Sequence, residues 1–434
     1  MKVHNSLLSA YIVLVLSSTD MHEMQFFDGR NYRINKVLLL CIGQWPYQTS
    51  KSSSAIIVII VSLAGTQFVA KICGLFSIDD IDVFIDSLSP LVVDIGCGVK
   101  LITCILKAPE IRALFDQIQS DWQSLMTSTK IKILDTYAQN GRKFTIIYAS
   151  TLYSALILFM LVPLQSLLLE SSLNSTNRPL LHRVEYYIDM DKYYFPILIH
   201  GYLTAIVCIS IAIATDTMYV IMVQHVCGLF TIIGQEMENI IKKDNKDSLQ
   251  INLYPTVQDD KPYENIIKSI YAHKRVLRFA NLIETAFNQM FLVLAGFNML
   301  IMSMTGVTAV TNVDKPEEFL RQITFACALL VHLFFESFQA QRLIDHSAHI
   351  YIRLLNEYSM VSDLNSDKKN LTLHDNEDAR TMCVNGRKNV RYIHGYFLYD
   401  CTYVGVIFHD ATFNAVTNLR RYYASCHRRI RNFS

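Results

Sequence analysis

The chain has 434 residues, of which 51% are hydrophobic and 18% are charged, and its formal net charge is +1. This excess of apolar over charged residues favours a membrane protein. The small net charge argues against a nucleic-acid partner, because binding to phosphates requires a concentrated basic surface.

Residues 1–23 contain Lys2 followed by an apolar stretch at 7–16, a pattern that resembles a signal peptide more than a spanning helix. A cleaved signal would place the next segment outside, against the loop charges described below. We therefore interpret 1–23 as a surplus segment upstream of a usable start at Met24. Residues 24–53 are then a cytoplasmic amino-terminal segment.

Four intervals lack charged residues over about the 20 positions that an α-helix needs to cross a bilayer. They lie between Lys51 and Lys71, Lys143 and Glu170, Lys192 and Asp216, and Glu284 and Asp314. Two further candidates contain polar groups, namely Asp94 and Lys100 in one and His332 in the other. We count both as spans, because charged side chains can face a bundle interior or reach the membrane surface. The predicted receptor domain covers 54–353, with spans at about 54–75, 84–106, 144–169, 195–223, 284–310 and 319–338.

Loop charges predict the orientation, because short cytoplasmic loops carry an excess of Lys and Arg. Segments 24–51, 107–143 and 224–283 carry four, six and eight such residues, whereas 77–86, 170–192 and 314–321 carry none, three and two. The amino terminus is therefore predicted to be cytoplasmic. A sequon at Asn174 falls in a predicted outer loop and is expected to be glycosylated, whereas the sequon at Asn370 should stay unmodified.

The carboxyl-terminal segment, 354–434, is an atypical polar tail. Its weak apolar stretch at 390–413 is interrupted by Arg391, His394, Asp400, His409 and Asp410. Each central Asp or Arg costs roughly 2.5–3.5 kcal/mol on insertion, so this stretch should not span the membrane unaided.

Several blocks of sequence resemble the insect odorant receptor family over residues 28–351. They are Ile34 to Pro46 (INKVLLLCIGQWP), Leu88 to Trp122, Ala214 to Tyr219 (ATDTMY), Val223 to Phe230 (VQHVCGLF), His273 to Arg275, Thr305 to Val307, and Gln341 to Ser347 (QRLIDHS). The resemblance implies an all-α membrane protein with the seven-transmembrane-helix odorant receptor architecture and a cytoplasmic amino terminus. Six spans are recognisable and the seventh is degenerate or missing.

The resemblance also implies a function. Such subunits are similar to odorant-tuning partners of a shared coreceptor, with which they form heterotetrameric odorant-gated cation channels in the plasma membrane of sensory neuron dendrites. The expected ligand is a small volatile or apolar odorant. Because the family's pore is built from the seventh helix, the 434-residue form is expected not to conduct, as the product of a mispredicted final exon or a decayed gene.

In this family the ligand pocket lies among the outer halves of helices two, three, four and six. The matching apolar stripes here are also compatible with ordinary core packing. The candidate ligand-binding residues are Leu88, Leu91, Val92, Tyr153, Leu156, Met160, Leu198, Tyr202, Phe325 and Ala328.

Several charged residues lie in or beside the predicted spans. Asp94 lies near the middle of one span and has no evident partner, because Lys100 lies about 240° away around the helix. Asp216, Glu284 and Glu336 are expected at cytoplasmic helix ends, where a charge costs less.

Alternative functions remain open. A gustatory-type receptor would share the scaffold. A G-protein-coupled receptor is disfavoured by the orientation and by the lack of Asp-Arg-Tyr and Asn-Pro-x-x-Tyr motifs, and a transporter by the lack of matched halves.

No catalytic motif or cofactor signature is found, so no enzyme is expected. Asp345, His346 and His349 lack further ligands at helical spacing, and no metal site is predicted. The ten cysteines form no CxxC pair, and those within apolar or helical context are interpreted as small buried side chains: Cys73, Cys97, Cys104, Cys208, Cys227 and Cys327.

Overall fold

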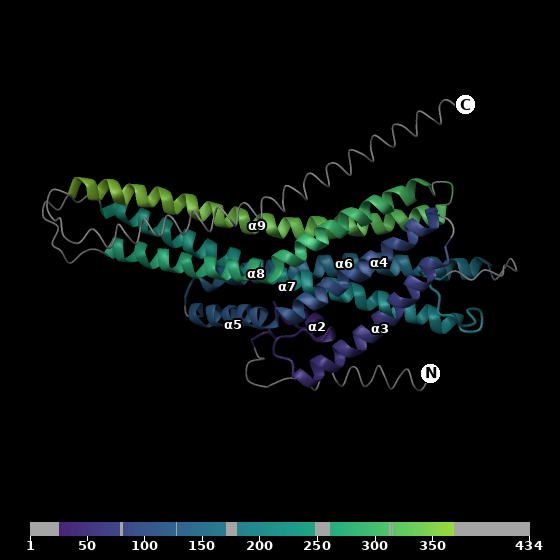
Figure 1. Cartoon of the computed structure of the whole chain (residues 1–434). Helices are drawn as coiled ribbons and strands as arrows, with labels where there is room; N and C mark the ends of the chain where they lie inside the picture. The colour runs from purple at the N-terminus through teal and green to yellow at the C-terminus, as the bar shows by residue number, and fades with distance from the viewer. Residues whose placement is uncertain are drawn as a thin grey trace, which may run out of the picture.

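A computed structural model describes residues 26–78, 81–126, 128–170, 180–247, 261–311, 314 and 316–368. Segment 1–23, both sequons and the stretch at 390–413 lie outside these residues. The described part forms eight helices (Figure 1): α2 (Arg33–Cys41), α3 (Ser50–Phe76), α4 (Ile81–Leu106), α5 (Ala108–Leu125), α6 (Ile131–Glu170), α7 (Tyr194–Asp247), α8 (Lys261–Thr311) and α9 (Pro316–Lys368).

Six of these helices are long and apolar enough to cross a membrane, which confirms the predicted all-α membrane fold. The candidate spans are Ser50–Phe76, Val83–Leu106, Ile131–Leu161, Tyr194–Glu236, Tyr271–Ala309 and Phe319–Ala348. Four helices, α6 to α9, are much longer than a bilayer requires. At 1.5 Å per residue, the 54 residues of α7 extend about 80 Å, against a hydrocarbon core of about 30 Å. The apolar intervals in the sequence therefore mark only part of each helix.

Helix α7 is the centre of the bundle and packs against α2, α3, α4, α5, α6, α8 and α9. Its side chains are buried on every face between Ile213 and Phe230. A helix that is apolar and buried all round must be enclosed by neighbours rather than by lipid. The run that includes Ala214 to Tyr219 therefore serves as the core against which the outer helices pack.

The segment before α3 packs against α5 through aromatic side chains. The Phe27 ring is fully buried and contacts the rings of Tyr32, Trp45, Tyr47 and Phe115. The Tyr47 hydroxyl donates to Asp116 at 2.5 Å, which satisfies its polar end. This aromatic cluster attaches the amino-terminal segment to the same end of the bundle as α5 (Figure 1).

Candidate functional site

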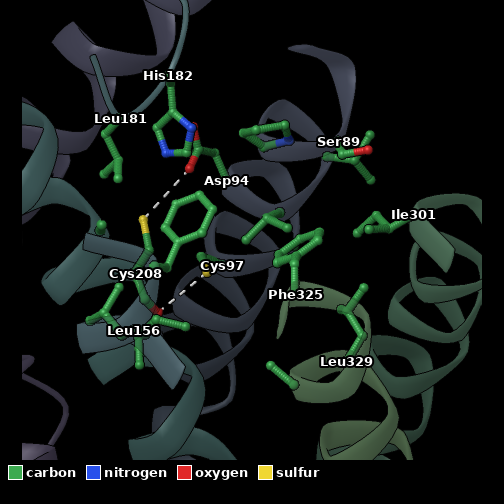
Figure 2. Close-up of a pocket in the computed structure, with 18 of the residues that line it drawn as sticks. Ser89, Asp94, Cys97, Leu156, Leu181, His182, Cys208, Ile301, Phe325 and Leu329 are labelled. Carbon is green, nitrogen blue, oxygen red and sulfur yellow. Dashed lines mark hydrogen bonds between the residues drawn. The ribbon is translucent and has the colours of Figure 1, made fainter. Parts of the chain in front are cut away.

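A cavity of about 770 Å³ lies inside the membrane-spanning part of the bundle. It is lined by α4, α6, α7, α8 and α9, by Lys71 of α3 and by the segment at 180–184, and most of its lining is apolar (Figure 2). Pro90 lies within α4 and lines this cavity. Proline lacks the N–H that would bond the carbonyl four residues earlier, so α4 loses a backbone hydrogen bond beside the cavity.

The structure brings four of the ten predicted ligand-binding residues to the cavity wall: Val92, Leu156, Phe325 and Ala328. The other six do not line it: Leu88, Leu91, Tyr153, Met160, Leu198 and Tyr202. Three of these form contacts between α6 and α7 instead. The Tyr153 hydroxyl lies 2.9 Å from Ser210 Oγ, and Tyr202 donates to the Met160 carbonyl at 2.8 Å.

Helix α8 contributes a wall that the sequence did not predict. Leu294, Phe297, Asn298 and Ile301 line the cavity. Their spacing of three and four residues places them on one helix face, a pattern that is visible in the sequence. The predicted set missed them because the resemblance assigned the pocket to other helices.

The segment at 180–185 covers the cavity and is attached to α3. The Glu185 amide donates to the Ala70 carbonyl at 2.9 Å. A Cβ added at Gly74 would lie 3.0 Å from Val184 Cα, so only glycine allows the two backbones to approach this closely. Leu181 and His182 therefore lie directly over the cavity (Figure 2).

Paired charges surround the same end of the cavity. Lys71 Nζ lies 2.8 Å from Asp94 Oδ2, and Arg321 donates to Asp86 at 2.7 Å. Gln322 also donates to Asp86. Burial, reinforced by Lys71 and Arg321, lowers the pKa of His182 well below its usual value, so this imidazole is neutral at physiological pH. Asp94, for which the sequence offered no partner, is paired with α3.

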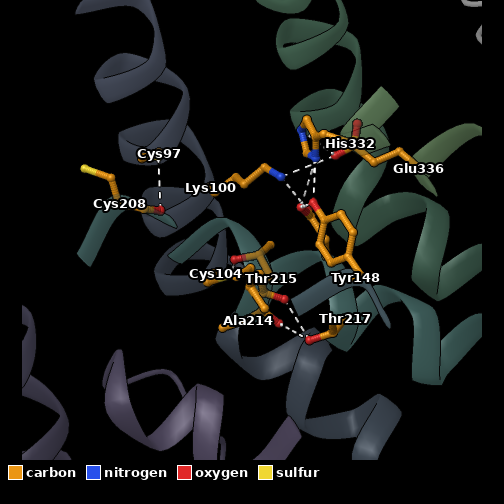
Figure 3. Close-up of polar contacts among 12 residues, drawn as sticks. Cys97, Lys100, Cys104, Tyr148, Cys208, Ala214, Thr215, Thr217, His332 and Glu336 are labelled. Carbon is orange, nitrogen blue, oxygen red and sulfur yellow. Dashed lines mark hydrogen bonds and ion pairs between the residues drawn. The ribbon is translucent and has the colours of Figure 1, made fainter. Parts of the chain in front are cut away.

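A second group of charges lies at the inner edge of the cavity, where Lys100 and His332 belong to the lining (Figure 3). The Lys100 ammonium pairs with Asp216 and lies 3.3 Å from Glu336 Oε1. The Tyr148 hydroxyl donates to Asp216 at 2.7 Å and lies 2.6 Å from His332 Nδ1. This charge cluster (Lys100, Tyr148, Asp216, His332 and Glu336) joins α4, α6, α7 and α9.

The charge cluster corrects the prediction that the acidic residues lie at helix ends. Asp216 and Glu336 are 1% and 6% exposed, and both lie inside spans, as does Glu284 in α8. The cause is the extent of the helices, since α7, α8 and α9 continue well beyond the predicted spans. The prediction that Lys100 does not pair with Asp94 is confirmed, because each has a different partner.

Ligand atoms of Asp216, His332 and Glu336 lie within 4.8 Å of one another, as in a metal site. The Lys100 ammonium already supplies positive charge to both carboxylates. We therefore interpret this group as an ion-pair network. His346 and Asp345 are engaged elsewhere, with Tyr137 and Gln341 respectively.

The comparisons with known proteins agree with this architecture. The family model described as 7tm Odorant receptor matches residues 80–353, more than half of the chain. The olfactory receptor OR5 of Machilis hrabei is similar in structure. Its complex with eugenol has a TM-score of 0.62 at 12% identity, covering 89% of this chain and 97% of that one. A second structure of the same receptor has a TM-score of 0.56 at 11% identity, covering 96% of this chain and 98% of that one.

No curated protein matches the sequence. The likeness to OR5 shows the fold, and the match to the family model shows membership. The family consists of multi-pass membrane receptors of the ligand-gated channel type, which are not enzymes. This chain belongs to the insect odorant receptor family.

Proposed function

We propose that this chain is the ligand-tuning subunit of a heteromeric odorant-gated cation channel in the plasma membrane of olfactory neurons. The observation that carries this proposal is the cavity of about 770 Å³ within the spanning helices, whose lining is more apolar than polar. Small apolar ligands bind in cavities of roughly 300–1,000 Å³ that exclude water and present few polar groups. The proposed ligands are small, mainly apolar odorants or cuticular hydrocarbons.

The charges around the cavity support a neutral ligand. Lys71, Asp86, Asp94, Lys100 and Arg321 each have an oppositely charged partner, and Arg183 is exposed. An ionic ligand would lose its hydration without gaining an unpaired counter-charge, which is costly in a buried site. Eugenol, the ligand named for Machilis OR5, is a small neutral molecule of the class that would fit here.

The coreceptor enters as part of the same proposal, because family resemblance implies that tuning subunits conduct only beside it. The long helices support an assembly role. Helices α7, α8 and α9 continue beyond their candidate spans and leave helical surface outside the bilayer. Helix α7 extends to Asp247, α8 begins at Lys261, and α9 extends to Lys368. Such extensions are suitable contact surfaces for neighbouring subunits.

The test is to record odorant-evoked currents from cells that express the coreceptor with this chain. A second version of this chain has residues 354–434 replaced with the closing helix of a family member. This version is included because the sequence of the tail predicts that the unmodified chain conducts poorly. Currents should require both subunits and should persist when G-protein signalling is blocked. Currents from this chain alone, or their loss under that block, would contradict the proposal.

The cavity itself is tested by a bulky substitution. Ala328→Trp places an indole in the cavity wall and should abolish or strongly weaken the odorant response. Cys327→Trp is the matched control, because Cys327 is the next residue in the chain and its side chain is exposed on the outside of the bundle. It should leave the odorant response unchanged. An unchanged response in Ala328→Trp would show that the ligand binds elsewhere.

A further inference from the structure

Asn298 is a buried polar residue of the cavity wall. Its side chain is only 6% exposed, it lines the cavity, and its Nδ2 amide has no hydrogen-bond acceptor among the described residues. Its lining neighbours on α8 are Leu294, Phe297 and Ile301, none of which offers a side-chain acceptor. An unpaired buried N–H is destabilising and uncommon in native proteins, so it needs a physical explanation.

Several other buried polar groups of the wall are already engaged. Lys71 and Asp94 pair with each other, Lys100 is held by Asp216, and the Cys97 thiol donates to the Cys208 carbonyl at 3.3 Å. These groups are fixed by contacts within the protein and would have to break them to bind a ligand. The Asn298 amide has no hydrogen bond to a described residue that it must break when its buried Nδ2 turns toward a ligand acceptor.

We propose that Asn298 is a specificity-determining residue, whose amide donates a hydrogen bond to a carbonyl or ether oxygen of a neutral ligand. This inference rests on the proposed function, in which the cavity holds the odorant. It narrows the ligand class from apolar molecules in general to oxygenated ones such as ketones and esters. It also adds α8 to the helices that contact the ligand.

The physical basis is the low polarity of the surroundings. Inside the cavity, an amide that meets a ligand oxygen gains a hydrogen bond, whereas a hydrocarbon of the same size leaves the amide unpaired. Sites that donate to a substrate oxygen therefore discriminate against analogues that lack it. For one neutral hydrogen bond, the expected preference is about tenfold in Kd.

The experiment measures binding to the purified full chain in phosphatidylcholine nanodiscs. The probes are 2-heptanone, which carries an acceptor, and n-octane, which has the same number of heavy atoms and none. Kd is obtained from the rise in Tm as each probe is titrated, because a ligand that binds only the folded state stabilises it by RT ln(1 + [L]/Kd). The wild type should bind 2-heptanone about tenfold more tightly than n-octane.

Asn298→Leu should remove this preference by weakening 2-heptanone alone. Asn298→Ala, which adds no bulk, should do the same and replaces the leucine variant if that one aggregates. Asn288→Leu is the matched control, since Asn288 lies on α8 away from the cavity lining, and it should keep the wild-type preference.

The outcomes separate this inference from the proposed function. Equal binding of both probes to the wild type, or a preference that survives in Asn298→Leu, would overturn the role of Asn298 and leave the cavity as a binding site. Failure of both probes to bind the wild type would overturn the cavity as an odorant site and this inference with it.

Discussion

Lys71 Nζ and Asp94 Oδ2, 23 positions apart in the chain, lie 2.8 Å apart and join α3 to α4 beside the cavity. Their side chains are 5% and 11% exposed, so both charges are largely removed from water. A buried ion pair of this kind contributes little relative to two apolar residues, but removing one partner leaves an uncompensated charge. Both charges are therefore expected to be needed together.

Lys71→Met is predicted to lower the free energy of unfolding by about 3 kcal/mol, because the buried Asp94 carboxyl loses its partner. Adding Asp94→Asn should recover much of this loss, since neither remaining side chain is charged. Lys51→Met is the control, because Lys51 is exposed on the same helix. Denaturation in detergent micelles measures these differences, and equal losses in the single and double variants would contradict the pairing.

The charge cluster leads to a second prediction. Lys100→Met should be among the most destabilising single substitutions in the chain, with a loss of about 3–5 kcal/mol, because Asp216 and Glu336 would face each other without a cation. Lys100→Met with Glu336→Gln should be more stable than Lys100→Met alone, since one carboxylate remains instead of two. The yield and Tm of the purified variants provide the measurement. No recovery in the double variant would show that the three groups are not coupled.

The outer architecture of this protein was predictable because it depends on local composition. Long uncharged intervals such as 144–169 require lipid or a core, and four of the six spans follow from them. The full length of α7 was not predictable, since its polar end carries no membrane signal although its residues form a helix. The position of Asp94 near the middle of a predicted span identified it as a buried charge. Its partner could not be predicted, because Lys71 lies on another helix and becomes a neighbour only when the two helices pack together.

The cavity was predicted in part for a related reason. Apolar stripes on α4, α6, α7 and α9 look alike whether they face a cavity or another helix, so Val92 and Leu156 could not be distinguished from Leu91 or Tyr153 by pattern alone. The segment at 180–184 carries no periodic signal, and its position over the cavity depends on contacts with α3. An apolar stripe on a helix therefore predicts that this face is buried, but not whether it lines a cavity or packs against another helix.

The close approach at Gly74 gives a third prediction. Gly74→Ala should destabilise the chain by about 1–3 kcal/mol, because the new Cβ meets backbone atoms of Arg183 and Val184 that cannot rotate away. Gly65→Ala is the matched control on the same helix, since nothing lies within 4 Å of its added Cβ, and it should gain up to about 1 kcal/mol from better helix propensity.

Hydrogen exchange reports the local effect of the same change. The Glu185 amide is bonded to the Ala70 carbonyl, so its exchange should be slow in the wild type and in Gly65→Ala. In Gly74→Ala this amide should exchange faster, because the covering segment is displaced from α3. Equal exchange in all three proteins would contradict the proposed attachment.

The fourth prediction concerns His182 and pH. Its pKa in the folded chain is lowered well below 6.5 by burial and by the nearby charges of Lys71 and Arg321. The unfolded chain therefore binds this proton more readily than the folded chain, and stability must fall as the pH drops below about 6.5. His182→Gln cannot take up the proton, so it should match the wild type near pH 7.5 and lose less stability at pH 5. Tm values of both proteins at the two pH values measure the difference. Since every other histidine is common to both, a wild type and variant that decline in parallel would show that the covering segment does not hold His182 neutral.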